Sequence, residues 1–189
     1  TEIGEYAFYK CSNVTEFHIP KNLVSIGQYA INDFKLTEIN ITKAISKINA
    51  NTWDCTGLQT VKFDANSACT EIGNNAFANE TQLSSITLPS TIRTIGYQAF
   101  SGCSSLTSIE LPDSITSIGY SAFSGTKLTS FTIPAGITEI NETRVVSGSY
   151  DAYETWFGVS RYSNETGGWV RRSFDSLIEL KFAEGSKCI

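Results

Sequence analysis

Histidine, positive charge and long apolar runs are all scarce in this chain, and each scarcity excludes a class of function. The 189 residues contain one histidine, charged residues make up 17%, and 14 Lys and Arg stand against 19 Asp and Glu for a net charge of −5. A nucleic-acid-binding protein needs a basic excess to neutralise phosphates, so we expect no nucleic-acid partner. No apolar run approaches the roughly 18 to 20 residues of a membrane-spanning helix, so we expect no membrane insertion of this segment.

The residues that build metal sites are also missing. His18 is the single imidazole, and no Cys-x-x-Cys pair occurs that would form a zinc knuckle. We therefore expect no metal and no cofactor. A cysteine nucleophile activated by His18 is the one catalytic alternative, but the pattern below places His18 on a strand face and the thiols in the core. We predict no catalytic residues.

Internal repetition is what the chain has in abundance. The hexad Ile-Gly-x-x-Ala-Phe and its degenerate copies begin at Ile3, Ile26, Ile48, Ile72, Ile95, Ile118 and Ile140. Successive copies are 22 to 24 residues apart, which defines about seven repeats. A second motif, Leu-x-x-Ile-x-Leu-Pro, follows each hexad at a fixed offset and is complete at 83–89 and 106–112. Such regularity predicts a repeat architecture.

Each repeat predicts the same local structure. Alternation in the second motif predicts one half-buried strand, which the following Pro ends by removing a backbone donor. The segment before the hexad predicts a short second strand, and the segment Ala99–Cys103 predicts a single 3₁₀ or helical turn. One such coil cannot bury its own Ile, Leu and Phe, whereas stacked coils can. We predict a mostly β, right-handed solenoid with a parallel β-sheet on one face.

The string LTSIELPDSITSIGYSAFSGT at 106–126 resembles the leucine-rich repeats of the BspA-like, Treponema-type family. The resemblance covers residues 3–140 and resumes at 177–188. It implies a leucine-rich repeat solenoid, an extracellular or cell-surface protein, and a non-enzymatic role in adhesion or binding of a host or matrix protein. It implies no catalytic residues. Because neither end shows a polar cap, we expect one leucine-rich repeat domain over 1–189 that belongs to a longer array.

Five cysteines would suggest disulfides, but the repeat register argues against them. Cys11 and Cys103 occupy one slot four repeats apart, with Cys55 in nearly the same column. At roughly 4.8 Å per strand, Cys11 and Cys103 are separated by about 19 Å, beyond the roughly 7 Å Cα limit of a disulfide. Cys69 and Cys188 share a slot that is aliphatic in other repeats. We predict five free thiols in the core.

The periodicity breaks in the seventh repeat. The next strand is expected at Leu177 instead of position 151, so about 26 residues are inserted, at about 146–176. Gly167-Gly168 and Asn164 predict the turn of a small hairpin there. Aromatic and Arg residues gather in the insertion, and both are enriched at binding hot spots. The predicted partner-binding residues are Tyr150, Tyr153, Trp156, Phe157, Arg161, Tyr162 and Trp169.

Several alternatives stay open. The aromatic residues of the insertion would pack on the solenoid if the insertion were a structural flap. Trp156 and Trp169 would be stacking platforms if it were a carbohydrate-binding module. An intracellular interaction scaffold is a further alternative, since reducing compartments preserve free thiols. The outward strand positions are small, polar and nearly neutral, which suits either a broad protein contact or a solvated face without a partner.

Overall fold

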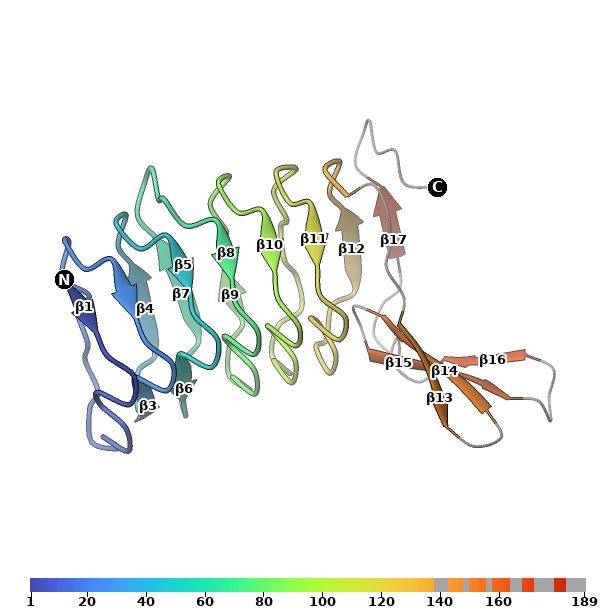
Figure 1. Cartoon of the computed structure of the whole chain (residues 1–189), viewed down its shortest axis with the longest axis horizontal. Coiled ribbons are helices and arrows are strands. Elements are labelled where there is room, and N and C mark those ends of the chain that lie inside the picture. Colours follow the sequence, from blue (N-terminus) through green and yellow to red (C-terminus); the bar gives the residue numbers. More distant parts are fainter. Residues whose placement is uncertain (138–142, 148–149, 156–157, 164–167, 172–178, 183–189) are drawn as a thin grey trace.

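Stacked β turns make up the body of the molecule. The computed structural model describes residues 1–137 and the strand segments 143–147, 150–155, 158–163, 168–171 and 179–182. Residues 1–137 form a solenoid whose turns follow one another along a single axis, and no helix occurs in the segments just given (Figure 1). The predicted mostly β solenoid with parallel strands is confirmed.

The strands of the solenoid are short, and most contain two to four residues. They are β1 (Glu2–Ile3), β2 (Ser25–Ile26), β3 (Ile31–Phe34), β4 (Glu38–Ile41), β5 (Lys47–Ile48), β6 (Trp53–Cys55), β7 (Thr60–Phe63), β8 (Glu71–Ile72), β9 (Ser85–Ile86), β10 (Thr94–Ile95), β11 (Ser117–Ile118), β12 (Ser130–Ile133) and β17 (Glu179–Phe182). They pair in parallel ladders, each of which collects equivalent positions of successive repeats.

The first ladder is built from the residues that open each hexad. β1 pairs with β2, and β5, β8, β10 and β11 form a four-stranded parallel sheet. The register sets Ile3 opposite Ile26, and it aligns Ile72 with both Ile48 and Ile95. Ile95 in turn lies opposite Ile118. These strands are the predicted short second strands, in the predicted phase.

The second ladder is built from the Leu-x-x-Ile-x-Leu motif. β4, β7 and β9 pair in parallel, with Ile39, Val61 and Ile86 in line. Residues alternate between exposed and buried along β4 and β12, as a half-buried strand requires. β12 also pairs in parallel with β17, and Phe131 lies opposite Leu180. The ladder therefore resumes at the strand predicted from Leu177.

The turn that follows each hexad differs from the predicted 3₁₀ or helical turn. The Cys103 N–H donates to the Phe100 carbonyl at 3.2 Å, yet Gln98 has a φ of 51° and Gly102 a φ of 76°. A 3₁₀ helix needs negative φ throughout. Left-handed φ turns the Gln98 N–H toward the next repeat, where it donates to the Tyr120 carbonyl at 3.3 Å. Hydrogen bonds between repeats thus replace those of a helix.

The glycine of the hexad is required by the close stacking of turns. A Cβ atom on Gly119 would lie 2.4 Å from the backbone nitrogen of Tyr97, and one on Gly96 would lie 2.7 Å from that of Asn74. Real Cβ atoms do not approach backbone that closely, so only glycine fits without moving the turns apart. The recurring Ile-Gly dipeptide is therefore explained by the short distance between the backbones of adjacent turns.

Aromatic rings stack through the middle of the core. The Phe77, Phe100 and Phe123 rings follow one another with centroids 5.5 Å apart and nearly parallel planes. Trp53 extends the stack on the other side of Phe77, at 6.4 Å. All four side chains are buried, as expected if stacked coils bury the Phe of the hexad. Aliphatic columns flank it, and one contains Leu23, Ile45, Cys69, Ile92, Ile115 and Ile137.

The cysteines follow the predicted register. Cys55, Cys69 and Cys103 are buried and unpaired, and Cys11 is unpaired and half-buried. Cys69 occupies the aliphatic column, as predicted. Cys188 lies outside the described residues. Among the described residues, the prediction of free core thiols is confirmed for Cys55, Cys69 and Cys103, whereas Cys11 is free but only partly buried at the edge of the core.

Candidate functional site

A second, separate sheet interrupts the solenoid between β12 and β17. Its strands are β13 (Thr143–Ser147), β14 (Tyr150–Thr155), β15 (Gly158–Ser163) and β16 (Gly168–Arg171), and each pairs antiparallel with the next. Figure 1 shows this meander beside the β12 end of the solenoid. It begins at Thr143, slightly before the predicted start of the insertion at 146. The predicted small hairpin corresponds to β15 and β16, within a larger sheet.

Five of the seven predicted partner-binding residues lie in this sheet, namely Tyr150 and Tyr153 in β14, Arg161 and Tyr162 in β15, and Trp169 in β16. The register sets Tyr162 directly opposite Trp169 and Tyr153 opposite Ser160. Trp156 and Phe157 lie outside the described residues. Sequence position alone spread these residues over twenty positions, whereas strand pairing gathers them on adjacent strands.

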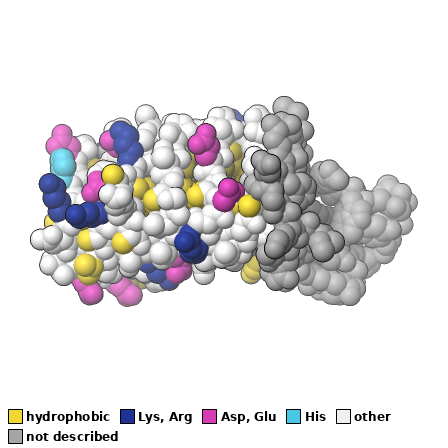
Figure 2. Space-filling view, turned by 90° about the horizontal axis from the view of Figure 1, so that it is seen from above, with side chains coloured by type: hydrophobic (Ala, Val, Ile, Leu, Met, Phe, Trp, Pro, Cys, Tyr) yellow, Lys and Arg dark blue, Asp and Glu magenta, His cyan; other side chains and the backbone are white. Residues whose placement is uncertain are grey.

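The face of the second ladder carries paired charges. Lys62 Nζ lies 2.7 Å from Glu38 Oε2, and Asn40 Nδ2 donates to Asp64 Oδ1 at 2.6 Å. Each contact joins neighbouring repeats, but only the first is an ion pair, and the second is a hydrogen bond between a neutral amide and a carboxylate. Figure 2, which looks from above onto one edge of the solenoid, shows charged side chains of both signs scattered among uncharged ones. The described solenoid therefore presents no strongly charged patch on these strands.

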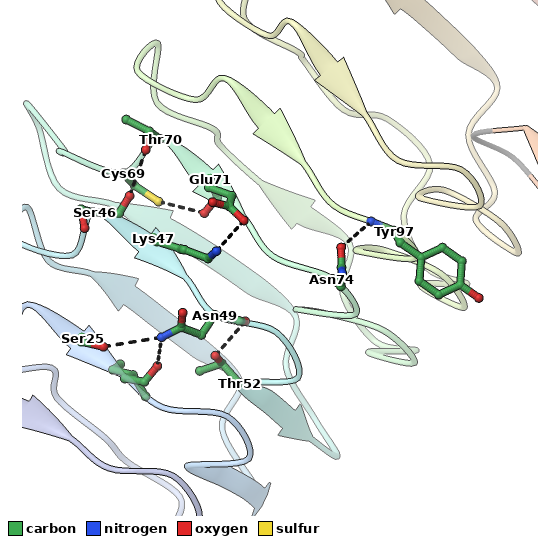
Figure 3. Close-up of polar contacts among 11 residues, drawn as sticks. Ser25, Ser46, Lys47, Asn49, Thr52, Cys69, Thr70, Glu71, Asn74 and Tyr97 are labelled. Atoms are coloured by element: carbon green, nitrogen blue, oxygen red, sulfur yellow. Dashed lines mark hydrogen bonds and ion pairs between the residues drawn. The ribbon is translucent and has the colours of Figure 1, made fainter. Parts of the chain in front are cut away.

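Polar side chains also tie the hexad turns together. Asn74 Oδ1 accepts a hydrogen bond from the Tyr97 N–H at 2.9 Å, and Asn49 Nδ2 donates to the Ile26 carbonyl at 2.7 Å. Figure 3 shows these contacts, with the Tyr97 ring directed away from the turn. Asn49 stands where other hexads have glycine, and its amide spans to the preceding repeat. The turns are thus linked by side chains as well as by backbone.

Aromatic and amide side chains line the outer edge of the hexad turns, a feature that the sequence analysis missed. Tyr6 and Tyr120 are exposed, at 53% and 37%. The Tyr6 ring stacks on that of Tyr29 at 5.1 Å, and the rings of Tyr97 and Tyr120 lie 4.7 Å apart. The available signal was the third and fourth positions of the hexad, where Tyr and Asn recur among residues that we treated as unspecified. We call this row the hexad edge.

Buried titratable groups lie in the core and face no open site. Glu80 is 2% exposed, and its Oε1 accepts the Cys55 N–H at 2.7 Å. Burial, helped by the nearby charge of Asp54, raises the pKa of Glu80 to about 8. Burial, helped by Glu80, raises the pKa of the Cys103 thiol to about 12. A thiol with a raised pKa stays protonated and is a weak nucleophile, and His18 is exposed on the strand side.

The parts of the chain that the structure describes contain no helix long and apolar enough to cross a membrane. They also contain no group of three or more His, Cys, Asp and Glu residues arranged to hold a metal ion. Two regions remain as candidate contact surfaces: the sheet β13–β16 and the hexad edge.

Known structures share this architecture. A leucine-rich repeat protein of T. pallidum is 26% identical, with a TM-score of 0.55 over 74% of this chain and 55% of that chain. A leucine-rich cell surface protein from Faecalibacterium prausnitzii A2-165 is 22% identical, with a TM-score of 0.63 over 97% of this chain and 51% of that chain. This chain therefore spans about half the length of these proteins. No curated protein matches it.

A family profile identifies the repeats directly. The BspA type leucine rich repeat region matches in six copies, over residues 1–80 and 70–144. These are the residues in which the hexad and the strand motif alternate, and in which the two parallel ladders form. The match extends over more than half of the chain, so the chain belongs to the BspA-type leucine-rich repeat family.

Proposed function

We propose that this chain is part of a cell-surface or secreted, non-enzymatic protein that adheres to a host or matrix protein. Membership of the BspA-type family supports a binding role. The fold of a protein named as a leucine-rich cell surface protein supports the location. The buried, protonated thiols and the paired charges of the strand face support a role without catalysis.

The observation that carries the proposal is the interruption of a uniform solenoid by the sheet β13–β16. Every other repeat keeps a spacing of 22 to 24 residues, so the added sheet is not needed to continue the ladder, which resumes at β17. An inserted element on a rigid scaffold is a common way to add a binding surface. Tyr, Trp and Arg, which its strands contain, are the residues most often found at binding hot spots.

The free thiols do not favour one compartment over another in this structure. Unpaired cysteines are typical of reducing compartments, which favours an intracellular scaffold. Three of the four described thiols are buried, however, and burial protects a thiol from oxidants in any compartment. The proposed location at the cell surface or the exterior therefore rests on the family and on the relative named as a cell surface protein, and not on the thiols. Labelling of intact source cells with a membrane-impermeant amine reagent tests this assignment, and protection of the protein until lysis would contradict it.

The test of the binding site removes the whole sheet. Residues 143–171 are replaced by a short Gly-Ser linker, and binding to intact host cells and to purified matrix proteins is compared with that of the unaltered chain. We expect the deletion to abolish binding while the circular dichroism and melting of the solenoid are retained. If the deletion unfolds the solenoid, the loss of binding is uninformative, and point variants that keep the sheet then test the site.

Matched aromatic substitutions sharpen the test. Tyr162→Ala with Trp169→Ala removes a cross-strand aromatic pair of the sheet. Tyr97→Ala with Tyr120→Ala removes an aromatic pair of the solenoid, whose rings are 4.7 Å apart. We expect the first double variant to weaken protein binding at least tenfold, the typical scale for hot-spot residues, and the second to leave it unchanged. If both double variants bind the partner as tightly as the unaltered chain does, the binding site lies on the strand face instead.

A further inference from the structure

A hollow of about 200 Å³ opens on the hexad edge, between the second, third and fourth hexad turns. Its lining includes Tyr29, Asn51, Trp53, Asp54, Asn75 and Asn79. These residues come from three successive repeats, so the solenoid stacking itself creates the hollow. We call it the amide groove. It lies within residues 29–79 and shares no residue with the sheet β13–β16.

One wall of the amide groove is aromatic. Tyr6 and Tyr29 occupy the same position in consecutive hexads, and their rings stack at 5.1 Å with planes 15° apart. One face of the Tyr29 ring is thus covered by Tyr6 from the preceding turn. The Tyr29 side chain lines the groove together with Asn51, which takes the same hexad position in the following turn. Tyr29 therefore offers a flat apolar face to the groove.

Three amides complete the lining without making hydrogen bonds of their own. The side chains of Asn51, Asn75 and Asn79 have no hydrogen-bond partner among the described residues, whereas Asn74 and Asn49 are both engaged between turns. The three asparagines have φ values of 50°, 53° and 64°, and asparagine tolerates this left-handed region better than most residues. Backbone geometry alone does not require the amide, however, because Gly102 and Gly125 serve at the position of Asn79 in later repeats.

The lining of the groove also includes a fixed acceptor, Asp54. Asp54 Oδ2 accepts a hydrogen bond from Asn32 Nδ2 at 2.7 Å, and Asn32 is only 7% exposed. This buried amide holds the carboxylate in place and leaves its second oxygen available. Trp53 is 2% exposed, and its indole nitrogen is closed off from solvent. Trp53 therefore contributes part of its ring to the lining and no hydrogen-bond donor.

We propose that the amide groove binds a neutral saccharide. Sugar hydroxyls both donate and accept hydrogen bonds, as amides do, and a carboxylate accepts from them. The C–H face of a pyranose ring packs on an aromatic face such as that of Tyr29. No Lys or Arg lines the groove, and its one charge is negative, so sialylated and sulfated sugars are repelled. The hollow is smaller than typical small-molecule sites of roughly 300–1,000 Å³, which suits one sugar unit of a chain.

The conformation of the three asparagines allows a clean variant. Glycine adopts left-handed φ more easily than asparagine, so Asn51→Gly with Asn75→Gly removes two amides while it preserves the turns. Asn66→Gly is the matched control, because Asn66 also has left-handed φ, at 57°, and lies outside the groove. The probes are chitotriose, cellotriose, maltotriose, N-acetyllactosamine and sialylated N-acetyllactosamine. Binding is followed by saturation-transfer NMR and by titration calorimetry.

We expect at least one neutral sugar to bind saturably, with a Kd on the order of 1 mM. The double glycine variant should bind it at least roughly tenfold more weakly, as expected for two lost hydrogen bonds, and the control variant should bind it unchanged. Tyr29→Ala should also lose binding, while Tyr97→Ala keeps it. Failure of every neutral sugar to bind up to its solubility limit would overturn the proposal. So would equal binding by the double glycine variant, or preference for the sialylated sugar.

This inference is independent of the proposed protein-binding function. Replacement of residues 143–171 by a linker should leave saccharide binding unchanged, because the groove is built entirely from earlier repeats. Conversely, the double glycine variant should bind the protein partner normally. Each proposal can therefore fail without the other.

Discussion

The solenoid and the sheet β13–β16 are both built from short β-strands, but they obtain their order in different ways. In the solenoid, paired residues are separated by one repeat, as Ile72 and Ile95 are. In the sheet, the chain pairs with itself a few residues later, as Ser147 does with Tyr150. Solenoid strands thus depend on neighbouring repeats, whereas strands of the sheet depend on local turns.

Because of this difference, we expect substitutions in the solenoid core to change the stability of the protein more than changes in the sheet do. Substitutions in the stacked core act on both adjacent repeats, because each buried side chain lies in a column that crosses the interface. We expect changes in the sheet to leave the ladders intact, since β17 continues the register of β12 beyond the sheet. We therefore expect residues 1–137 to account for most of the free energy of unfolding.

The largest effect should come from truncation in the aromatic column. Phe100 is fully buried and stacks at 5.5 Å on both Phe77 and Phe123. Phe100→Ala should therefore lower the free energy of unfolding by about 3 to 5 kcal/mol. Trp169→Ala should leave it nearly unchanged, because among the described strands β16 pairs only with β15 and with no strand of the solenoid. Urea titrations followed by circular dichroism measure the free energy of unfolding of both variants. A similar decrease for the two would show that the sheet contributes to stability as the solenoid core does.

A pH-dependent effect should follow from Glu80. Its pKa is raised from 4.5 to about 8, mainly by burial. The folded protein therefore binds the proton that the unfolded chain loses above pH 4.5, so stability falls as pH rises from about 4.5 to 8 and then levels off. Glu80→Gln, which keeps an acceptor for the Cys55 N–H, should remove a loss on the order of a few kcal/mol.

Denaturation midpoints at a series of pH values between 5 and 8 test the Glu80 prediction. Above this window the Cys69 thiol, whose pKa is raised to about 11 mainly by burial, adds its own loss of stability. The unaltered protein should lose stability across the window, and Glu80→Gln should show a flatter profile. Parallel profiles for the two proteins would show that Glu80 is already ionised in the folded state.

An intermediate effect is expected at the glycine of the hexad. Gly119→Ala places a Cβ atom 2.4 Å from the Tyr97 nitrogen, so the turns must shift, at a cost of about 1 to 3 kcal/mol. Gly4→Ala is the matched control at the same hexad position, because no atom lies within 4 Å of its Cβ. Thermal melting of the two variants measures the difference. Equal melting temperatures would mean that the solenoid accommodates wider spacing without strain.

The smallest effect should come from the exposed ion pair of the strand face. The side chains of Glu38 and Lys62 are about half exposed, at 52% and 55%. Water and salt screen such a pair, so Glu38→Gln should change the free energy of unfolding by less than about 1 kcal/mol. The change should shrink further in high salt. A larger, salt-independent loss would show that the strand face contributes to stability as the core does.

The ladders and the core could be predicted because each structural position is occupied by a similar residue in several successive repeats. Ile72, Ile95 and Ile118 each mark the start of a strand, and Cys69 could be placed in the core because other repeats have Ile or Leu there. The insertion could be located from the broken spacing. The predicted binding role of its aromatic residues stays a prediction.

Other features could not be predicted because they depend on contacts between repeats. Tyr6 and Gln98 have left-handed φ, although neither residue type favours it. The carbonyl groups of the next repeat impose that conformation by accepting their N–H groups, at 3.0 and 3.3 Å. The amide groove likewise joins residues from three repeats. Strand β13 was not predicted because its first residues, Thr143–Val145, are also the second half of the degenerate hexad that begins at Ile140.

The parallel pairing of β12 with β17 has a consequence for protein engineering. In a parallel pair the end of one strand and the start of the next lie at opposite ends of the strands, and here Ile133 is level with Phe182 while Glu179 is level with Ser130. The chain from β12 to β17 must therefore return along the length of the strands, and the sheet β13–β16 lies within that return in the sequence. A foreign domain could be displayed in place of the sheet as long as the residues that complete the coil, such as the buried Ile137, are kept.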